Sequence, residues 1–253
     1  MADYAPGTPI WVDVSSRDLD ASRAFYSGLF GWEAQVAPEP EAGGYTLFLK
    51  DGKMVGGLGP TFSPDQPCLW ATYLSTADAA ATAQAVKDNG GQVLVGPMQV
   101  MDQGSMAVFV DPTGAHICVW QSGKNKGAEV FNEPGSLIWN ELYTRDMPTA
   151  KTFYEKVFGL ESSENTMENG DTYTEFKIDG RTVAGGMDMH FLPDDVPPHW
   201  LVYLAVENVD DAAAKAQELG GKLLNPVMDI QIGRFAVVQD TQGAPFAIFE
   251  SKS

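Results

Sequence analysis

The sequence is poor in the residues that disulfide frameworks, metal sites and membrane segments require. Its 253 residues include 2 cysteines and 3 histidines. Cys68 and Cys118 form no disulfide framework, so we expect a protein of the reducing cytoplasm. No segment contains the roughly 20 consecutive apolar residues of a membrane-spanning helix. Residues 1–9 lack the basic and apolar parts of a signal peptide, which also favours a cytoplasmic location.

Positive charge is also scarce. The chain has 16 Lys and Arg residues against 34 Asp and Glu residues, which gives a net charge of −18 at pH 7. A surface this acidic repels nucleic-acid phosphates and anionic lipid headgroups, so we expect neither nucleic acid nor membranes as partners. Hydrophobic residues make up 44% of the chain, which suffices for two domains with their own cores. The sequence leaves open whether the protein forms an oligomer.

What the sequence does contain is an internal duplication. Residues 11–26 return as residues 139–154, at an offset of 128 (139 minus 11), and the offset holds without a gap from residues 7–55 to residues 135–183. A fixed offset of this kind indicates two copies of one structural unit. The segment between the copies lacks periodicity. We therefore predict a first domain over residues 1–122, a linker over 123–134 and a second domain over 135–253.

Each copy is predicted to contain two strand–helix–strand–strand–strand units. Asp18 and Asp146 are suited to cap helices, because a short carboxylate accepts hydrogen bonds from the free amides of the first turn. Gly31 and Gly159 are suited to the left-handed position that ends a helix. Helices are expected over residues 18–30, 78–89, 146–158 and 209–219. Strands are expected over residues 7–16, 32–37, 44–50, 53–59, 68–74, 92–100, 105–110 and 115–121, and over residues 136–144, 160–167, 171–178, 181–189, 199–206, 222–231, 234–239 and 245–250.

Three motifs carry a resemblance to a known family. They are the Arg-Asp…Phe-Tyr helix of residues 17–26 and 145–154, the Gly-Gly pairs after the second helices, and the turn of residues 111–114, Asp-Pro-Thr-Gly. In these motifs the chain resembles the vicinal oxygen chelate superfamily of glyoxalases, extradiol dioxygenases and bleomycin resistance proteins, in particular its two-domain actinobacterial members. The resemblance implies an α+β fold with four βαβββ units, which pair into two glyoxalase-like domains with U-shaped, cavity-forming mixed sheets.

Metal-dependent members of that superfamily hold their ion at fixed positions, where this sequence has other residues. The resemblance places ligands seven residues before the helix-capping Asp, on the first strand of the second unit, and seven residues after the turn Asp. Those positions are occupied by Trp11, Ala71 and Cys118 in the first copy and by Trp139, Leu201 and Ala247 in the second. Indole and alkyl groups do not coordinate metal ions, and one thiol does not make a site. We therefore expect no metal and no other cofactor.

Strand alternation predicts which side chains share the face that binds ligands in the family. In the first copy these are Trp11, Asp13, Ser15, Ala71, Tyr73, His116, Cys118 and Trp120. In the second copy they are Trp139, Glu141, Tyr143, His199, Leu201, Tyr203 and Phe249. Each set is rich in aromatic rings and holds one carboxylate and one imidazole. That composition is typical of a pocket for a flat or ring-bearing small molecule.

Asp13 and Glu141 occupy equivalent positions and are the candidate catalytic residues. An apolar surround favours proton transfer by a carboxylate, whereas a carboxylate that caps a backbone amide or faces water is structural. The preferred interpretation is a metal-independent protein that binds an aromatic or polycyclic small molecule. One alternative is a natural-product tailoring enzyme of hydroxylase type, or an aldehyde-detoxifying lyase, that uses the carboxylate. Another is a structural or interaction protein whose cavities are filled by its own side chains.

Overall fold

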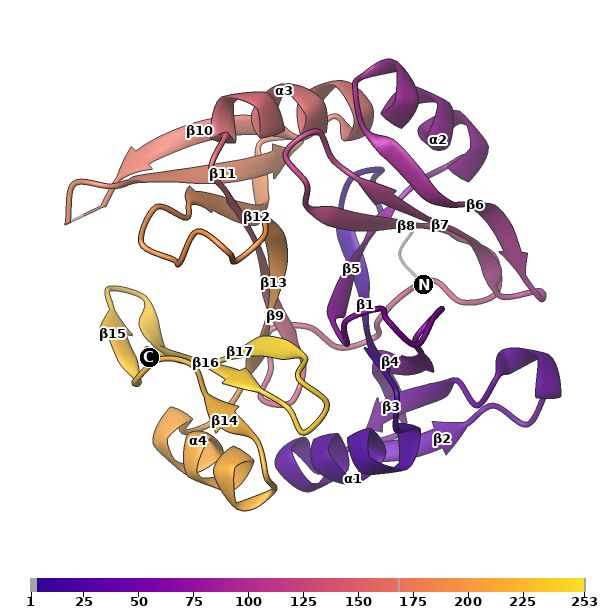
Figure 1. Cartoon of the computed structure of the whole chain (residues 1–253), viewed down its shortest axis with the longest axis vertical. Coiled ribbons are helices and arrows are strands. Elements are labelled where there is room, and N and C mark those ends of the chain that lie inside the picture. Colours follow the sequence, from indigo (N-terminus) through magenta and orange to yellow (C-terminus); the bar gives the residue numbers. More distant parts are fainter. Residues whose placement is uncertain (1–3, 168, 253) are drawn as a thin grey trace. The chain divides into compact units, whose positions relative to one another are not determined.

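A computed structural model describes residues 4–167 and 169–252 (Figure 1). The predicted α+β fold of repeated βαβββ units is confirmed. The first copy contains β1 (Pro9–Ser16), α1 (Leu19–Phe30), β2 (Glu33–Val36), a 3₁₀ turn (Pro40–Ala42), β3 (Thr46–Lys50), β4 (Lys53–Pro60), β5 (Trp70–Ser75), α2 (Ala79–Asp88), β6 (Gln92–Val100), β7 (Gly104–Val110) and β8 (His116–Ser122). The second contains β9 (Leu137–Thr144), α3 (Met147–Phe158), β10 (Glu161–Thr166), β11 (Thr172–Ile178), β12 (Arg181–Asp188), β13 (His199–Ala205), α4 (Val209–Glu218), β14 (Lys222–Leu223), β15 (Met228–Ile230), β16 (Gly233–Gln239) and β17 (Pro245–Ser251).

The helix ends follow the capping residues that the sequence indicates. The Asp18 carboxylate accepts a hydrogen bond from the Ala21 amide at 3.0 Å, and α1 begins at the next residue. The equivalent Asp146 accepts from the Thr149 amide at 3.1 Å before α3. Gly31, with φ of 71°, ends α1 in the left-handed conformation that a residue without Cβ adopts at no steric cost. Local chemistry therefore sets where these helices begin and end.

The strands form two mixed sheets, with strand order β2-β3-β4-β1-β5-β8-β7-β6 in one and β10-β11-β12-β9-β13-β17-β16-β14 in the other, where β15 also pairs with β16. Within a βαβββ unit the first strand pairs in parallel with the last strand. Strand β1 pairs in this way with β4, and β9 pairs with β12. The prediction of one strand over residues 222–231 is wrong. The segment is split into β14 and β15 at residues 224–227, where the Asn225 side-chain oxygen accepts from the Val237 amide at 2.6 Å in place of a backbone carbonyl.

The chain divides into two compact units that do not follow the order of the copies. One unit, here called the α2–α3 unit, consists of residues 1–11, 72–127 and 139–201. The other, the α1–α4 unit, consists of residues 12–71, 128–138 and 202–253. Each unit has its own apolar core, with Phe109, Phe153 and Phe176 in the α2–α3 unit and Phe25, Phe48 and Phe246 in the other. Both units therefore draw on both copies.

A buried hydrogen-bond chain fastens the two copies together inside the α2–α3 unit. The Trp200 indole donates to the Tyr154 hydroxyl at 2.7 Å, and that hydroxyl donates to Asp111 Oδ2 at 2.9 Å. The other oxygen, Asp111 Oδ1, accepts from the Thr113 and Ala115 amides at 2.7 and 3.1 Å. Burial raises the pKa of Tyr154 far above its ordinary value, so the hydroxyl stays a donor. The predicted turn of residues 111–114 thus also anchors the helix of the second copy.

The α1–α4 unit contains the equivalent chain. The Trp70 indole donates to the Tyr26 hydroxyl at 2.9 Å, and Tyr26 donates to Asp240 at 2.8 Å. Here the helix belongs to the first copy and the turn to the second. The tyrosine of each Phe-Tyr pair is fully buried and supplies a polar contact between copies.

The domain boundary at residues 123–134 remains a prediction, and limited proteolysis tests it. We expect the first cut within residues 121–134, where Gly123, Lys124 and Glu129 are exposed. The nicked protein should still elute as one species in size-exclusion chromatography, because each compact unit contains parts of both copies. A first cut inside residues 68–120 would contradict the boundary, and separate elution of the two fragments would contradict the shared units.

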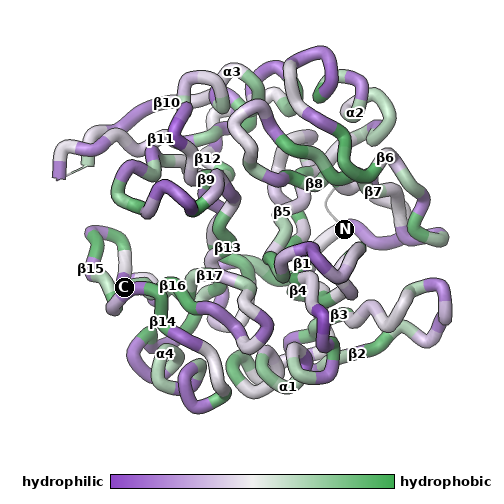
Figure 2. Tube along the Cα trace, in the orientation of Figure 1, coloured by the Kyte–Doolittle hydropathy of each residue, from purple (hydrophilic) through white to green (hydrophobic). Residues whose placement is uncertain are grey.

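The helices are short and of mixed polarity. Figure 2 shows hydrophilic and hydrophobic residues together in each of α1 to α4. Over residues 4–167 and 169–252, none of the helices has the length and apolar character needed to cross a membrane.

Candidate functional site

The strand β9 carries three of the predicted ligand-binding side chains on one face. Trp139, Glu141 and Tyr143 alternate along it, so they point to the same side. Glu141 is only 6% exposed, which is unusual for a carboxylate and requires compensating donors. Glu141 is therefore the centre of the candidate site.

Two tyrosine hydroxyls satisfy the buried carboxylate. The Tyr143 hydroxyl donates to Glu141 Oε2, and the Tyr173 hydroxyl on β11 also forms a hydrogen bond with Glu141. The Trp139 indole in turn donates to the Tyr173 hydroxyl at 2.9 Å. Burial, and next the nearby Glu141 charge, raise the pKa of Tyr173 far above its ordinary value, so Tyr173 stays protonated. The indole, the phenol and the carboxylate thus form one directed chain of hydrogen bonds.

Gly185 makes room for this chain. It pairs with Glu141 across the parallel strands β12 and β9. A Cβ at Gly185 would lie 1.9 Å from the Tyr173 hydroxyl oxygen and 2.9 Å from the Trp139 indole nitrogen. No side chain fits at those distances, so the close approach of Tyr173 to Glu141 depends on a glycine at this position.

Two more rings contact Tyr143. His199, the first residue of β13, stacks on Tyr143 with ring centroids 5.4 Å apart and planes 18° from parallel. Phe191, 53% exposed, meets Tyr143 edge-on with centroids 6.1 Å apart. His199 Nδ1 lies 2.9 Å from the Pro197 carbonyl oxygen. A neutral ring that donates from Nδ1 to this carbonyl keeps Nε2 as an acceptor. We call Trp139, Glu141, Tyr143, Tyr173, Phe191 and His199 the Glu141 cluster.

The pKa of His199 should be low enough to keep the ring neutral at pH 7. Burial lowers the pKa from 6.5 and outweighs the opposing Pro197 hydrogen bond and Glu141 charge. The unfolded chain therefore binds a proton on His199 more tightly than the folded protein does. The stability contributed by the neutral ring is complete above pH 6.5, and it is lost as the pH falls through the pKa of His199 in the folded protein. An NMR titration of the ring protons should give a midpoint below 6.5, which His199→Gln removes. A midpoint above 6.5 would contradict this assignment.

The first copy holds a reduced version of the site in the α1–α4 unit. The Tyr45 hydroxyl donates to Asp13 Oδ2 at 3.0 Å, and a Cβ at Gly57 would lie 2.1 Å from that hydroxyl. Ser15 stands where the second copy has Tyr143, and its hydroxyl hydrogen-bonds the Leu69 amide and carbonyl instead. The carboxylate–tyrosine pair is therefore duplicated, and the second tyrosine is not.

The remaining predicted residues lie as follows. Tyr73 on β5 pairs with Cys118 on β8, and both are buried. The buried Trp120 donates its indole N–H to the Asn125 carbonyl at 2.9 Å. His116 is exposed at the start of β8. Trp11 is buried on β1 in the α2–α3 unit. Tyr203 and Phe249 lie in the α1–α4 unit, with their ring centroids 6.4 Å apart.

The sequence alone did not identify Tyr173 or its counterpart Tyr45. Strand alternation sorts residues within one strand, whereas Tyr173 reaches Glu141 from β11, with β12 lying between β11 and β9. The duplication held a usable signal, because Tyr45 and Tyr173 are separated by the same 128 residues as Asp13 and Glu141. A tyrosine and a carboxylate retained at equivalent positions in both copies point to a shared contact.

The inherited metal positions do not fit a metal ion. Trp11, Cys118, Trp139 and Ala247 offer one thiol between them. Over residues 4–167 and 169–252, His, Cys, Asp and Glu side chains nowhere gather in groups of three or more that could hold an ion. The side chains therefore supply hydrogen bonds and aromatic surface rather than a coordination shell.

Comparison with known proteins shows what the chain is similar to. A model of the Glyoxalase/Bleomycin resistance protein/Dioxygenase superfamily matches residues 9–119 and 136–248. The anthracycline biosynthesis protein DauV of Streptomyces sp. (strain C5) is 41% identical over 99% of this chain and 95% of its own. CFP32 of Mycobacterium bovis is 39% identical over 98% of this chain and 97% of its own.

Solved structures share the fold at much lower identity. The Mn(II)-bound glyoxalase from Novosphingobium aromaticivorans aligns with a TM-score of 0.66 and 16% identity, over 97% of this chain and 82% of its own. The 2,3-dioxygenase LapB from Pseudomonas sp. KL28 aligns with a TM-score of 0.65 and 14% identity, over 100% of this chain and 94% of its own. These two structures support the fold, and the 39–41% relatives share the whole length of the chain.

Proposed function

We propose that this chain, which belongs to the glyoxalase/bleomycin resistance protein/dioxygenase superfamily, binds a small ring-bearing molecule at the Glu141 cluster without a metal ion. One observation carries the proposal: the Glu141 carboxylate is only 6% exposed, lies among aromatic rings and accepts hydrogen bonds from two tyrosine hydroxyls. Membership of the superfamily supports a small-molecule ligand. A cytoplasmic location is part of the same proposal.

The cluster offers a ring-bearing ligand two kinds of contact. Trp139, His199 and Phe191 are partly or largely exposed, so their faces are available for stacking. Glu141 and the Nε2 atom of His199 accept hydrogen bonds, which suits a ligand with phenolic or other hydroxyl groups. The names of DauV and of the 40% identical DnrV place those relatives in anthracycline biosynthesis. Anthracyclines, which are planar fused-ring compounds, are therefore the first ligands to test.

A fluorescence titration tests the binding proposal. Addition of an anthracycline should quench the tryptophan fluorescence of the protein in a saturable way, after correction for absorption by the ligand. Trp139→Phe should reduce the amplitude of the quench, because this indole borders the carboxylate. Quenching that rises linearly without saturation would instead favour a structural or interaction protein.

A second candidate function is acid–base catalysis on the bound molecule. The observation that favours it is the chain from the Trp139 indole through the Tyr173 hydroxyl to Glu141, which fixes a carboxylate beside a protonated phenol. Such a group can accept a proton from a ligand and return it. In an enzyme of this kind Glu141→Gln should abolish turnover while the ligand still binds, whereas in a binding protein the same variant changes affinity alone.

Metal independence is tested by elemental analysis of protein purified without an affinity tag. We expect far less than one equivalent of zinc, nickel or iron per chain, because the inherited positions hold indole and alkyl groups. Treatment with a chelator should leave ligand binding unchanged. About one metal per chain, together with activity lost on chelation and restored by Zn²⁺, Ni²⁺ or Fe²⁺, would instead indicate a glyoxalase- or dioxygenase-type enzyme.

A further inference from the structure

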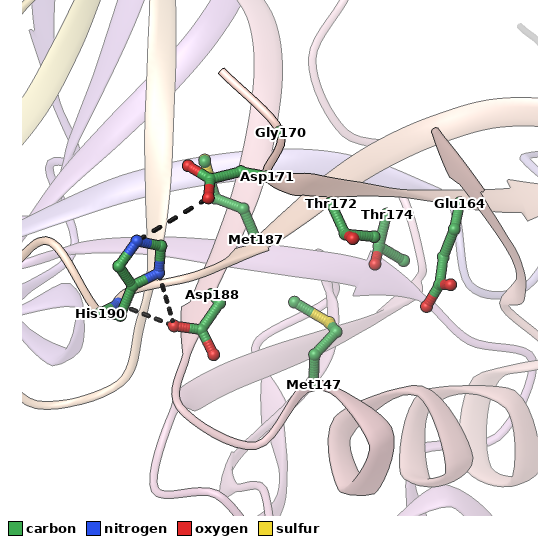
Figure 3. A pocket seen from close by; sticks show the side chains of 9 residues that line it. All are labelled: Met147, Glu164, Gly170, Asp171, Thr172, Thr174, Met187, Asp188 and His190. Carbon is green, nitrogen blue, oxygen red and sulfur yellow. Dashed lines mark hydrogen bonds and ion pairs between the residues drawn. The ribbon is translucent and has the colours of Figure 1, made fainter. Parts of the chain in front are cut away.

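A second site is indicated in the α2–α3 unit, on the other face of β11. A hollow of about 370 Å³ lies between the start of α3, the strands β10 and β11, and the end of β12 (Figure 3). Thr172 and Thr174 line it and alternate with Tyr173 along β11, so the hollow and the Glu141 cluster lie on opposite faces of this strand. Its volume is near the lower end of the roughly 300–1,000 Å³ of small-molecule pockets.

The hydroxyl of Thr174 forms no hydrogen bond with any residue that the structure describes. Thr174 is 1% exposed, and its Oγ1 is the buried side-chain oxygen without a partner among the residues that the structure describes. An unsatisfied buried hydroxyl costs free energy, and natural proteins contain few of them. A donor that reaches this oxygen from the hollow would remove that cost.

The first copy shows which donor the position accepts. Thr46 is the equivalent residue, because Val36 pairs with Thr46 in the β2–β3 ladder as Glu164 pairs with Thr174 in the β10–β11 ladder. Arg23 donates from its guanidinium Nη1 to the Thr46 hydroxyl at 3.1 Å. The hydroxyl itself donates to the Gly44 carbonyl at 3.2 Å, so a cationic N–H group is the donor that Thr46 accepts in the first copy.

In the second copy the equivalent donor makes a different contact. Lys151 occupies the position equivalent to Arg23, 128 residues later, and its ammonium pairs with Glu164 instead. Glu164 itself replaces Val36. The Lys151 ammonium therefore pairs with Glu164 rather than with Thr174, whose hydroxyl has no partner among the residues that the structure describes.

In the second copy, acidic side chains line the hollow. Besides Glu164, the carboxylates of Asp171 and Asp188 line it, where the first copy has Gly43 and Pro60. His190 lies between these two residues, with Nδ1 3.1 Å from Asp188 and Nε2 3.8 Å from Asp171 (Figure 3). A single imidazole cannot neutralise both carboxylates, so the hollow attracts a cation. These residues are not among those that could hold a metal ion, which favours an organic cation.

We propose that the hollow binds the protonated amino group of a small organic amine. The ammonium group donates one hydrogen bond to Thr174 Oγ1, in place of the guanidinium that Arg23 supplies to Thr46, and its charge is balanced by Asp171 and Asp188. Met147 lines the hollow, and its methyl group lies over Gly186, directly across the ladder from Thr174. An unbranched thioether changes rotamer easily, so this methyl group can move aside as the amine enters.

Methyl NMR of the whole protein, labelled at the methionine methyl groups, tests the proposal with ethanolamine as the probe. The Met147 signal should shift in a saturable way with ethanolamine. Ethylene glycol and glycolate, which have similar size but no positive charge, should leave it unchanged. Thr174→Val, which keeps the shape and removes the hydroxyl, should weaken ethanolamine binding about tenfold. The matched variant Thr46→Val should leave the affinity unchanged.

A second variant converts the hollow into its first-copy counterpart. Lys151→Arg combined with Glu164→Val restores both residues of the first copy, and the new guanidinium should occupy the Thr174 hydroxyl and abolish the ethanolamine shift. In the free protein Thr174→Val should also raise the unfolding midpoint, since it removes an unpaired polar group, whereas Thr46→Val should lower it. Equal shifts with ethylene glycol, no saturable shift with ethanolamine, or unchanged affinity in Thr174→Val would each overturn the proposal.

Discussion

Replacing Gly185 by alanine should abolish ligand binding at the Glu141 cluster and destabilise the protein by about 2–4 kcal/mol. The added methyl group would lie 1.9 Å from the Tyr173 hydroxyl, so Tyr173 must move away from Glu141. The buried carboxylate then loses one of its two tyrosine donors, and the Trp139 indole loses its acceptor. Chemical denaturation and calorimetric titration with an anthracycline measure the two effects.

Gly96→Ala is the matched control for this change. Gly96 lies in the same α2–α3 unit, and a Cβ there would meet no other atom within 4 Å. We therefore expect unchanged binding and nearly unchanged stability for Gly96→Ala. Tyr173→Phe, which removes the hydroxyl alone, should weaken ligand binding with a smaller loss of stability. If Gly185→Ala bound ligand as tightly as the unmodified protein, Tyr173 would not belong to the binding site.

Asp111→Ala should cost about 3–5 kcal/mol of folding free energy. The carboxylate is 3% exposed and accepts hydrogen bonds from the Tyr154 hydroxyl and from the Thr113 and Ala115 amides. Alanine leaves these three donors buried without an acceptor. Because Asp111 and Tyr154 belong to different copies, the loss should loosen the α2–α3 unit as a whole.

Urea denaturation, monitored by near-ultraviolet circular dichroism, measures the loss of folding free energy in Asp111→Ala. Asp102→Ala is a suitable control in the same unit, because Asp102 is an exposed carboxylate whose ion pair with Lys124 lies at the surface. Its midpoint should be almost unchanged. A loss for Asp111→Ala below about 1 kcal/mol would mean that the buried chain does not fasten the copies together.

Local signals in the sequence were sufficient for most of the fold. The caps at Asp18 and Asp146 and the left-handed Gly31 act through neighbouring residues, so their effects can be predicted without tertiary structure. The break between β14 and β15 was missed because residues 222–231 were treated as one run, whereas the Asn225 side chain replaces a backbone acceptor there. The composition of the compact units was not predictable, since nothing in the sequence indicates that Tyr154 donates to Asp111 of the other copy rather than within its own.

Strand alternation predicted the members of the Glu141 cluster on β9 and β13, but not Tyr173 or Phe191. Alternation placed Trp139, Glu141 and Tyr143 on one face, whereas Tyr173 arrives from a strand two positions away in the sheet. The two histidines illustrate the same limit. His199 stacks on Tyr143 while His116 is exposed, although the sequence favoured both equally. Strand alternation gives a face, and the tertiary structure decides which imidazole stacks on a ring.

The central claim, that Glu141 anchors a ring-bearing ligand, is tested most directly by calorimetric titration of an anthracycline into the unmodified protein and into Glu141→Gln. The exposed Glu161→Gln in the same unit serves as the control. We expect saturable binding to the unmodified protein and to Glu161→Gln, and an affinity at least about tenfold lower for Glu141→Gln, which replaces one carboxylate acceptor by an amide donor. Equal affinity of Glu141→Gln and the unmodified protein would contradict the account.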